Sequence, residues 1–125
     1  MRNPRYTPAA ITLLSLVIAA GCYRHPAAPD EAGAWLTALI AQLEGAPPEN
    51  PPVVIARYEY KGETVYFLPQ RCCDQMSVLY HADGAVICHP DGGFAGTGDG
   101  QCPDFFTQRR DEHIVWRDAR TIPGN

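Results

Sequence analysis

The segment Val53-Val-Ile-Ala-Arg-Tyr-Glu-Tyr60-Lys-Gly-Glu63-Thr-Val-Tyr-Phe-Leu68 decides the fold of this chain. β-Branched and aromatic residues dominate both of its halves, and such side chains pack well on a pleated surface. Lys61-Gly62 separates the halves and suits a two-residue turn, because Gly adopts positive φ without steric cost. The segment predicts a β-hairpin with strands at 53–60 and 63–68.

A second hairpin is predicted directly downstream, from strands at 76–80 and 85–88. The two strands are joined through Asp83-Gly84, a pair of residues that tolerates the left-handed dihedrals of tight turns. This turn fixes the expected cross-strand pairs, which are Leu79 with Cys88 and Tyr80 with Ile87.

A helix is predicted upstream of the hairpins, over 31–44. Asp30 and Glu31 supply a capping carboxylate and an acidic first turn, and Gly45 and the prolines at 47 and 48 end the pattern. Apolar residues recur at three- and four-residue spacing and form one stripe: Trp35, Leu36, Leu39, Ile40 and Leu43.

A short edge strand, 113–116, follows near the C-terminus with charged residues on both sides. The order of helix, hairpin, hairpin and strand predicts an α+β domain. We expect the N-terminal helix to pack on one face of a small antiparallel sheet, with disulfides stabilising the whole.

Residues 1–21 have the composition of an export signal. Arg2 and Arg5 give a positive start, and the apolar run at 11–18 is shorter than the roughly 20 residues that cross a membrane. Small residues at 19–21 precede Cys22, which resembles the lipobox of bacterial lipoproteins, where this cysteine is acylated and becomes the first mature residue. Ala19 stands where a lipobox usually has Leu, and ordinary signal cleavage is the alternative.

Cysteine parity favours lipidation of Cys22. Four cysteines then remain, an even number that suits two disulfides in an oxidising compartment: Cys72, Cys73, Cys88 and Cys102. Tyr23, rather than Asp, follows Cys22, and by resemblance to lipoprotein sorting in Gram-negative bacteria this favours the outer membrane, facing the periplasm. The predicted organisation is a signal peptide at 1–21, a lipidated and flexible tether at 22–29 and one domain at 30–122.

The sequence leaves the disulfide connectivity open. Adjacent cysteines on extended backbone point to opposite sides, so Cys72 and Cys73 are expected to meet different partners. Bridges to Cys88 or Cys102 would close loops of about 15 or about 30 residues, each worth roughly 3 kcal/mol. A vicinal bridge between Cys72 and Cys73 is a further option. A four-thiolate zinc site is another, although no pair has the Cys-x2–4-Cys spacing of such sites.

Residues 72–104 resemble a family of small exported bacterial lipoproteins that is classed only as a domain of unknown function. The shared signature is Cys72-Cys73-Asp74, Ile87-Cys88, Pro90-Asp-Gly-Gly93 and Gly98-Asp-Gly-Gln-Cys102. The resemblance covers about Trp35 to Phe105. It implies a periplasm-facing domain and carries no assigned activity, cofactor or catalytic residue.

Charge and motifs exclude several functions. Removing Arg2 and Arg5 with the leader changes the formal net charge from −4 to −6, and no basic cluster exceeds Arg109-Arg110. Nucleic acid binding, which needs a patch that neutralises phosphates, is therefore not expected. The sequence lacks Gly-x-Ser-x-Gly, His-Glu-x-x-His and phosphate-loop motifs, and we expect neither an enzyme nor a catalytic residue.

Two functional hypotheses remain, and both use the glycine-rich segment after Cys88. The first is a non-enzymatic, lipid-anchored module that binds an unknown protein partner, such as a hydrolase to be inhibited, through the loop between Cys88 and Cys102. The second is a calcium-stabilised domain in which the loop at 89–104 binds the ion through Asp91, Asp99 and Asp104. Asp-Gly pairs are more often simple turns, so no cofactor is expected under the first hypothesis.

Overall fold

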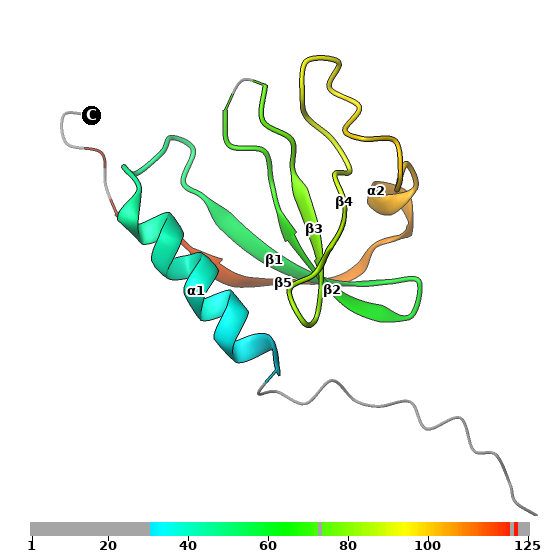
Figure 1. The fold of residues 1–125 in the computed structure, drawn as a ribbon, viewed down its shortest axis with the longest axis horizontal. Helices are drawn as coiled ribbons and strands as arrows, with labels where there is room; N and C mark the ends of the chain where they lie inside the picture. The colour runs from blue at the N-terminus through cyan, green and yellow to red at the C-terminus, as the bar shows by residue number, and fades with distance from the viewer. Residues whose placement is uncertain (1–30, 73, 121, 123–125) are drawn as a thin grey trace, which may run out of the picture.

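A five-stranded antiparallel sheet forms the centre of the structure, a computed structural model that describes residues 31–72, 74–120 and 122 (Figure 1). The strand order is β4-β3-β2-β1-β5. The elements in chain order are α1 (Glu31–Gly45), β1 (Val54–Tyr60), β2 (Glu63–Leu68), β3 (Val78–His81), β4 (Val86–Cys88), α2 (Phe105–Gln108) and β5 (Arg110–Arg117). The predicted α+β class, with one long helix on an antiparallel sheet, is confirmed.

The hairpin of β1 and β2 has the predicted turn. Tyr60 lies opposite Glu63, and Lys61 and Gly62 both have positive φ, 51° and 82°. Both central residues of a type I′ turn need this conformation, which matches the twist of the flanking strands. Alternate residues of β1 and β2 then point to the two faces of the sheet, and each face builds its own core cluster.

Helix α1 covers one face of the sheet with the predicted apolar stripe. Its side chains pack against Ile55, Tyr66 and Leu68. The Trp35 indole N–H donates to the Ala82 carbonyl oxygen at 2.8 Å, so the first half of α1 lies beside the β3–β4 turn. Gly84 in that turn has φ 89°, and a Cβ there would lie 2.6 Å from Trp35 Cγ, so only glycine fits.

The C-terminal segment holds the other end of α1. The Arg120 guanidinium donates to three carbonyl oxygens at the C-terminal end of the helix: those of Leu43 (3.2 Å), Glu44 (2.7 Å) and Ala46 (2.9 Å). Asp118, which is 4% exposed, accepts from the same guanidinium at 2.7 Å. This carboxylate therefore orients the arginine that caps α1.

The opposite face of the sheet is covered by α2 and by the chain around Cys102. Phe105 is fully buried, and its ring packs against three aromatic rings of the sheet, those of Tyr58, Tyr60 and Phe67. Helix α2 is not predicted from the sequence, because its four residues are too few to show the apolar repeat of a helix.

Two details of the sheet differ from prediction. Leu79 lies opposite Cys88, as predicted, but Tyr80 lies opposite Val86 rather than Ile87, because the register shifts between Leu79 and Tyr80. Strand β5 is also longer than the predicted 113–116, since it begins at Arg110. Arg110, in the added part of β5, lies opposite Glu59 of β1, beyond a shift in register between Arg57 and Glu59. Charged residues and bulges of this kind are typical of an edge strand.

Several predictions concern residues outside the described part of the chain. These are the signal peptide, the lipidated Cys22 with its tether, and Cys73. Among the described helices, none is both long and apolar enough to cross a membrane.

Candidate functional site

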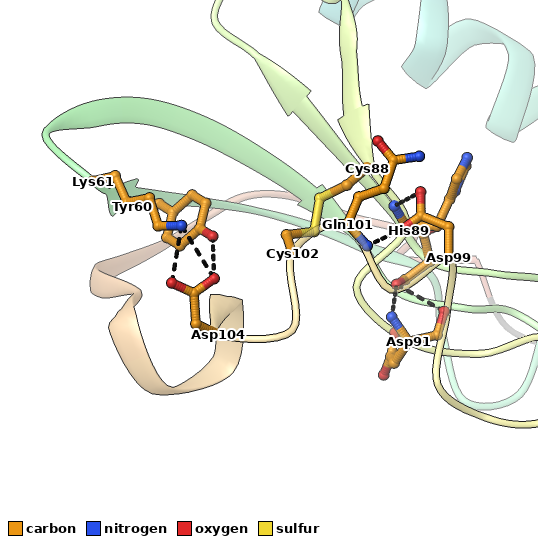
Figure 2. Close-up of a disulfide and its surroundings, with 10 residues drawn as sticks. Tyr60, Lys61, Cys88, His89, Asp91, Asp99, Gln101, Cys102 and Asp104 are labelled. Carbon is orange, nitrogen blue, oxygen red and sulfur yellow. Dashed lines mark hydrogen bonds and ion pairs between the residues drawn. A yellow bond between two sulfur atoms is a disulfide. The ribbon is translucent and has the colours of Figure 1, made fainter.

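The candidate site is the loop of residues 89–101, which begins after β4 and is closed by a disulfide between Cys88 and Cys102 (Figure 2). The two Cα atoms are 6.2 Å apart, and the cysteines are only 2% and 4% exposed. Both belong to the core cluster under α2. The disulfide is therefore packed between the sheet and the chain that returns from the loop.

This bridge resolves part of a connectivity that the sequence leaves open: Cys72 and Cys73 do not each bond to one of the later cysteines. Cys88 bonds to Cys102 because the glycine-rich segment turns back on itself and brings both onto the same face of the sheet. Cys72 is also disulfide-bonded, and Cys73 lies outside the described residues.

Ser77, immediately before β3, anchors the start of the loop. This residue is fully buried, and its hydroxyl oxygen accepts from the Asp91 backbone N–H at 3.1 Å. Its own backbone N–H donates to the Asp91 carbonyl oxygen at 3.0 Å, and its carbonyl oxygen accepts from His89 Nδ1 at 2.7 Å. A carbonyl can only accept, so Nδ1 of His89 carries a proton.

Asp99 fastens the far side of the loop to the near side. Its carboxylate accepts from the backbone N–H groups of Gln101 (2.9 Å) and His89 (3.0 Å), while its own N–H donates to the His89 carbonyl oxygen at 3.0 Å. The hydrogen bond from Gln101, with a smaller contribution from that of His89, holds the pKa of Asp99 below its ordinary value. The carboxylate is a structural tie within the loop.

The three carboxylates named in the calcium hypothesis do not converge on one point in this structure. Figure 2 shows Asp104 on the far side of the disulfide from Asp99 and Asp91, pointing at the β1–β2 turn. It accepts from the Tyr60 hydroxyl at 2.6 Å and pairs with Lys61 Nζ at 2.9 Å, and these hydrogen bonds lower its pKa. Within the described residues, no group of His, Cys, Asp and Glu side chains could hold a metal ion. The carboxylates of Asp99 and Asp104 thus bond to different parts of the chain, whereas Asp91 contacts Ser77 through its backbone.

Phe94 lies at the tip of the loop and is 99% exposed. The backbone N–H of Gly96 donates to the carbonyl oxygen of Gly93 at 3.1 Å, so Phe94 and Ala95 occupy the centre of a tight turn. Met76, 42% exposed, packs beneath this turn next to Gly93. The sequence analysis missed Phe94, although it is the only aromatic residue in a segment of glycines and polar residues.

A second group of side chains surrounds Tyr58 on β1, next to the edge strand β5. Its hydroxyl donates to the Glu112 carboxylate and accepts from Arg109 Nη1 at 3.1 Å. Arg109 also lies over the rings of Phe105 and Phe106. Burial, reinforced by the hydrogen bond to Glu112, raises the pKa of Tyr58 to about 12, so this tyrosine is neutral and packs the core.

Together these features define a small disulfide-bonded α+β domain whose candidate site is a surface loop closed by a disulfide. The chain belongs to the family described as a domain of unknown function (DUF6970), which matches residues 41–118, more than half of its length. The match runs from within α1 to Asp118 and so includes the whole sheet and the loop. No curated protein and no solved structure matches this chain.

Proposed function

We propose that this protein is a lipid-anchored module of the bacterial cell envelope that binds a protein partner through the loop of residues 89–101. The observation that carries the proposal is the 99% exposure of Phe94. A phenylalanine gains roughly 1.5–3 kcal/mol when it moves from water into an apolar pocket. Large aromatic side chains are also well suited to act as anchors at the centre of protein interfaces.

The rigidity of the loop supports binding. The disulfide closes its base, Ser77 and Asp99 tie its two sides, and the Gly93–Gly96 turn fixes its tip. A loop that is ordered before it meets a partner loses little conformational entropy on binding, and that loss is a large part of what limits affinity. The anchor Phe94 is therefore presented in one arrangement.

Binding is proposed rather than catalysis because the reactive groups beside the loop are engaged in structure. The Ser77 hydroxyl is buried and hydrogen-bonded to Asp91, and His89 Nδ1 donates to a carbonyl oxygen. A nucleophile needs a neighbouring base aimed at it and an exposed reacting atom. An inhibitor of a hydrolase is one form of the proposal, with Phe94 entering a pocket of the enzyme.

The anchor is proposed from the leader and Cys22. A tether of about eight residues after Cys22 spans roughly 15–25 Å, depending on how far its prolines extend it. The domain would thus stay close to the membrane surface, on the periplasmic side of the outer membrane. Acylation of Cys22 provides this attachment, since residues 11–18 are too few to span a bilayer.

Photo-crosslinking in cells tests the proposal. A photoreactive amino acid at Ala95 is compared with one at Val86, which is 54% exposed on β4 and serves as the matched control. We expect a discrete cross-linked protein from position 95 only, which Phe94→Ala abolishes. Equal cross-linking from both positions, or a product that survives Phe94→Ala, would contradict the role of the loop.

A further inference from the structure

A separate cleft of about 330 Å³ opens where the chain enters β1 and leaves β2. This volume is just above the roughly 300 Å³ at which pockets begin to accept small-molecule ligands. Its apolar lining consists of Pro51, Pro52, Val53, Val54 and Pro69, and its polar lining of Glu49, Gln70, Arg71 and Arg117. The cleft shares no residue with the loop at 89–101.

The apolar part of the cleft follows from the local sequence. Prolines 51 and 52 precede β1, and proline 69 follows β2. Proline has no backbone N–H that would need a hydrogen-bond partner in the cleft. Val54 lies opposite Arg117 in the β1–β5 pair, so the two side chains project from the same face of the sheet. An apolar wall therefore stands directly beside a guanidinium group.

The cleft has more positive than negative side chains: two arginines and one glutamate. Glu49 Oε1 lies 3.4 Å from Arg71 Nη1, longer than the 2.7–2.9 Å of a charge-assisted hydrogen bond. The Arg71 guanidinium therefore keeps donors for another anion. The Arg117 side chain has neither a hydrogen bond nor an ion pair with any described residue. Two cations and one loosely held carboxylate thus line this cleft, on a chain whose formal net charge is −4.

We propose that this cleft binds a small-molecule carboxylate with an apolar body. The ligand's carboxylate takes the place of Glu49 at Arg71 and engages Arg117, while its body lies against the prolines and valines. A planar carboxylate matches the fork of guanidinium donors, and Glu49 already places that group in the cleft. At about 30 Å³ per non-hydrogen atom, by comparison with liquid water, the volume suits about eleven such atoms.

Titration with octanoate, which has ten non-hydrogen atoms, tests the proposal. The protein is the whole exported chain with Cys22→Ser, purified from the periplasm with its disulfides formed, so that no detergent competes. Resonances of Val53 and Val54 are followed by NMR. We expect saturable binding in the millimolar range or tighter, as about ten ligand atoms allow. The neutral analogue octanamide is expected to bind at least about tenfold more weakly.

Three charge substitutions and a control give the decisive pattern. Arg71→Gln and Arg117→Gln are each expected to weaken octanoate binding at least about tenfold, the loss of one charge-assisted hydrogen bond. Glu49→Gln removes the internal competitor and is expected to tighten binding severalfold without removing a cation. Arg57→Gln, at an exposed residue of β1 that does not line the cleft, is the matched control and is expected to change nothing.

Several results would overturn the assignment. These are no saturable binding of octanoate, equal binding of octanamide, or unchanged affinity in the Arg71 and Arg117 variants when thermal melting shows them folded. Binding of octyl phosphate without binding of octanoate would also refute a carboxylate site. Phe94→Ala is expected to leave octanoate affinity unchanged, so failure of the loop proposal and failure of this one are distinguishable.

Discussion

Replacing both Cys88 and Cys102 by alanine is the sharpest test of how the loop of residues 89–101 is held. The disulfide closes a loop with a sequence separation of 14, for which the chain-entropy relation gives about 3 kcal/mol. Two buried sulfur atoms are also lost from the core, at roughly 0.8 kcal/mol for each group of that size. Alanine is preferred to serine because a buried hydroxyl without a partner would add an unrelated cost.

The expected result is a loss of about 4–5 kcal/mol in the free energy of unfolding, measured by urea denaturation. The urea m-value should rise, because the unfolded chain without the cross-link exposes more surface. In native-state hydrogen exchange, the amides of Gly98 and Asp99, which bond to Gly92 and His89 across the loop, should lose protection first.

Phe94→Ala is the matched control in the same loop. Its side chain is 99% exposed, so the free energy of unfolding should change by less than about 0.5 kcal/mol. A loss below about 1 kcal/mol in the double cysteine variant, or a comparable loss in Phe94→Ala, would refute the account of a loop ordered by its cross-link.

Three further predictions concern the core, the pH dependence and the anchor. Phe105→Ala should cost about 3–5 kcal/mol in urea unfolding because the side chain is fully buried, whereas 41%-exposed Phe106→Ala should cost clearly less. The pKa of Tyr58 is raised to about 12, so its contribution to the free energy of unfolding is complete below pH 10 and is lost as the pH rises toward 12. Thermal melts at alkaline pH and tyrosinate absorbance can follow this loss. Tyr58→Phe should remove the contribution of Tyr58 to the pH dependence. Cys22→Ser should move the protein from the membrane fraction to the soluble periplasmic fraction, and mass spectrometry of the unaltered protein should find acyl groups on Cys22.

The sheet and α1 were predictable because their signals are local. The apolar residues from Trp35 to Leu43 recur with the period of a helix. A two-residue turn needs positive φ at both of its residues, and Lys61 and Gly62 both adopt it. Register was less predictable. Asp83-Gly84 correctly placed Leu79 opposite Cys88, but no sequence pattern announced the irregularity that sets Tyr80 opposite Val86.

The position of the candidate site in the sequence was predictable, but its disulfide pairing and hydrogen bonds were not. Glycine content identified 89–101 as a loop, yet the pairing of Cys88 with Cys102 depends on how that loop turns back onto the sheet. The contacts of Asp91 and Asp104 depend on residues distant in sequence: the Asp91 backbone N–H donates to Ser77, and the Asp104 carboxylate accepts from Tyr60. Carboxylates in glycine-rich segments look alike in sequence whether they bind a metal ion or backbone N–H groups.

The topology also decides which end of the domain can meet a partner. The first half of α1 lies beside the β3–β4 turn, where Trp35 bonds to Ala82, while the loop at 89–101 begins at the other end of β4 (Figure 1). The six residues of β2 extend over about 20 Å between these two ends of the sheet. If Cys22 is acylated as we propose, the tether joins the domain at α1, at the end away from the loop that carries Phe94. An anchored domain of this kind would present Phe94 away from its own membrane, so the partner we propose is a protein of the periplasmic space and not one embedded beside the anchor.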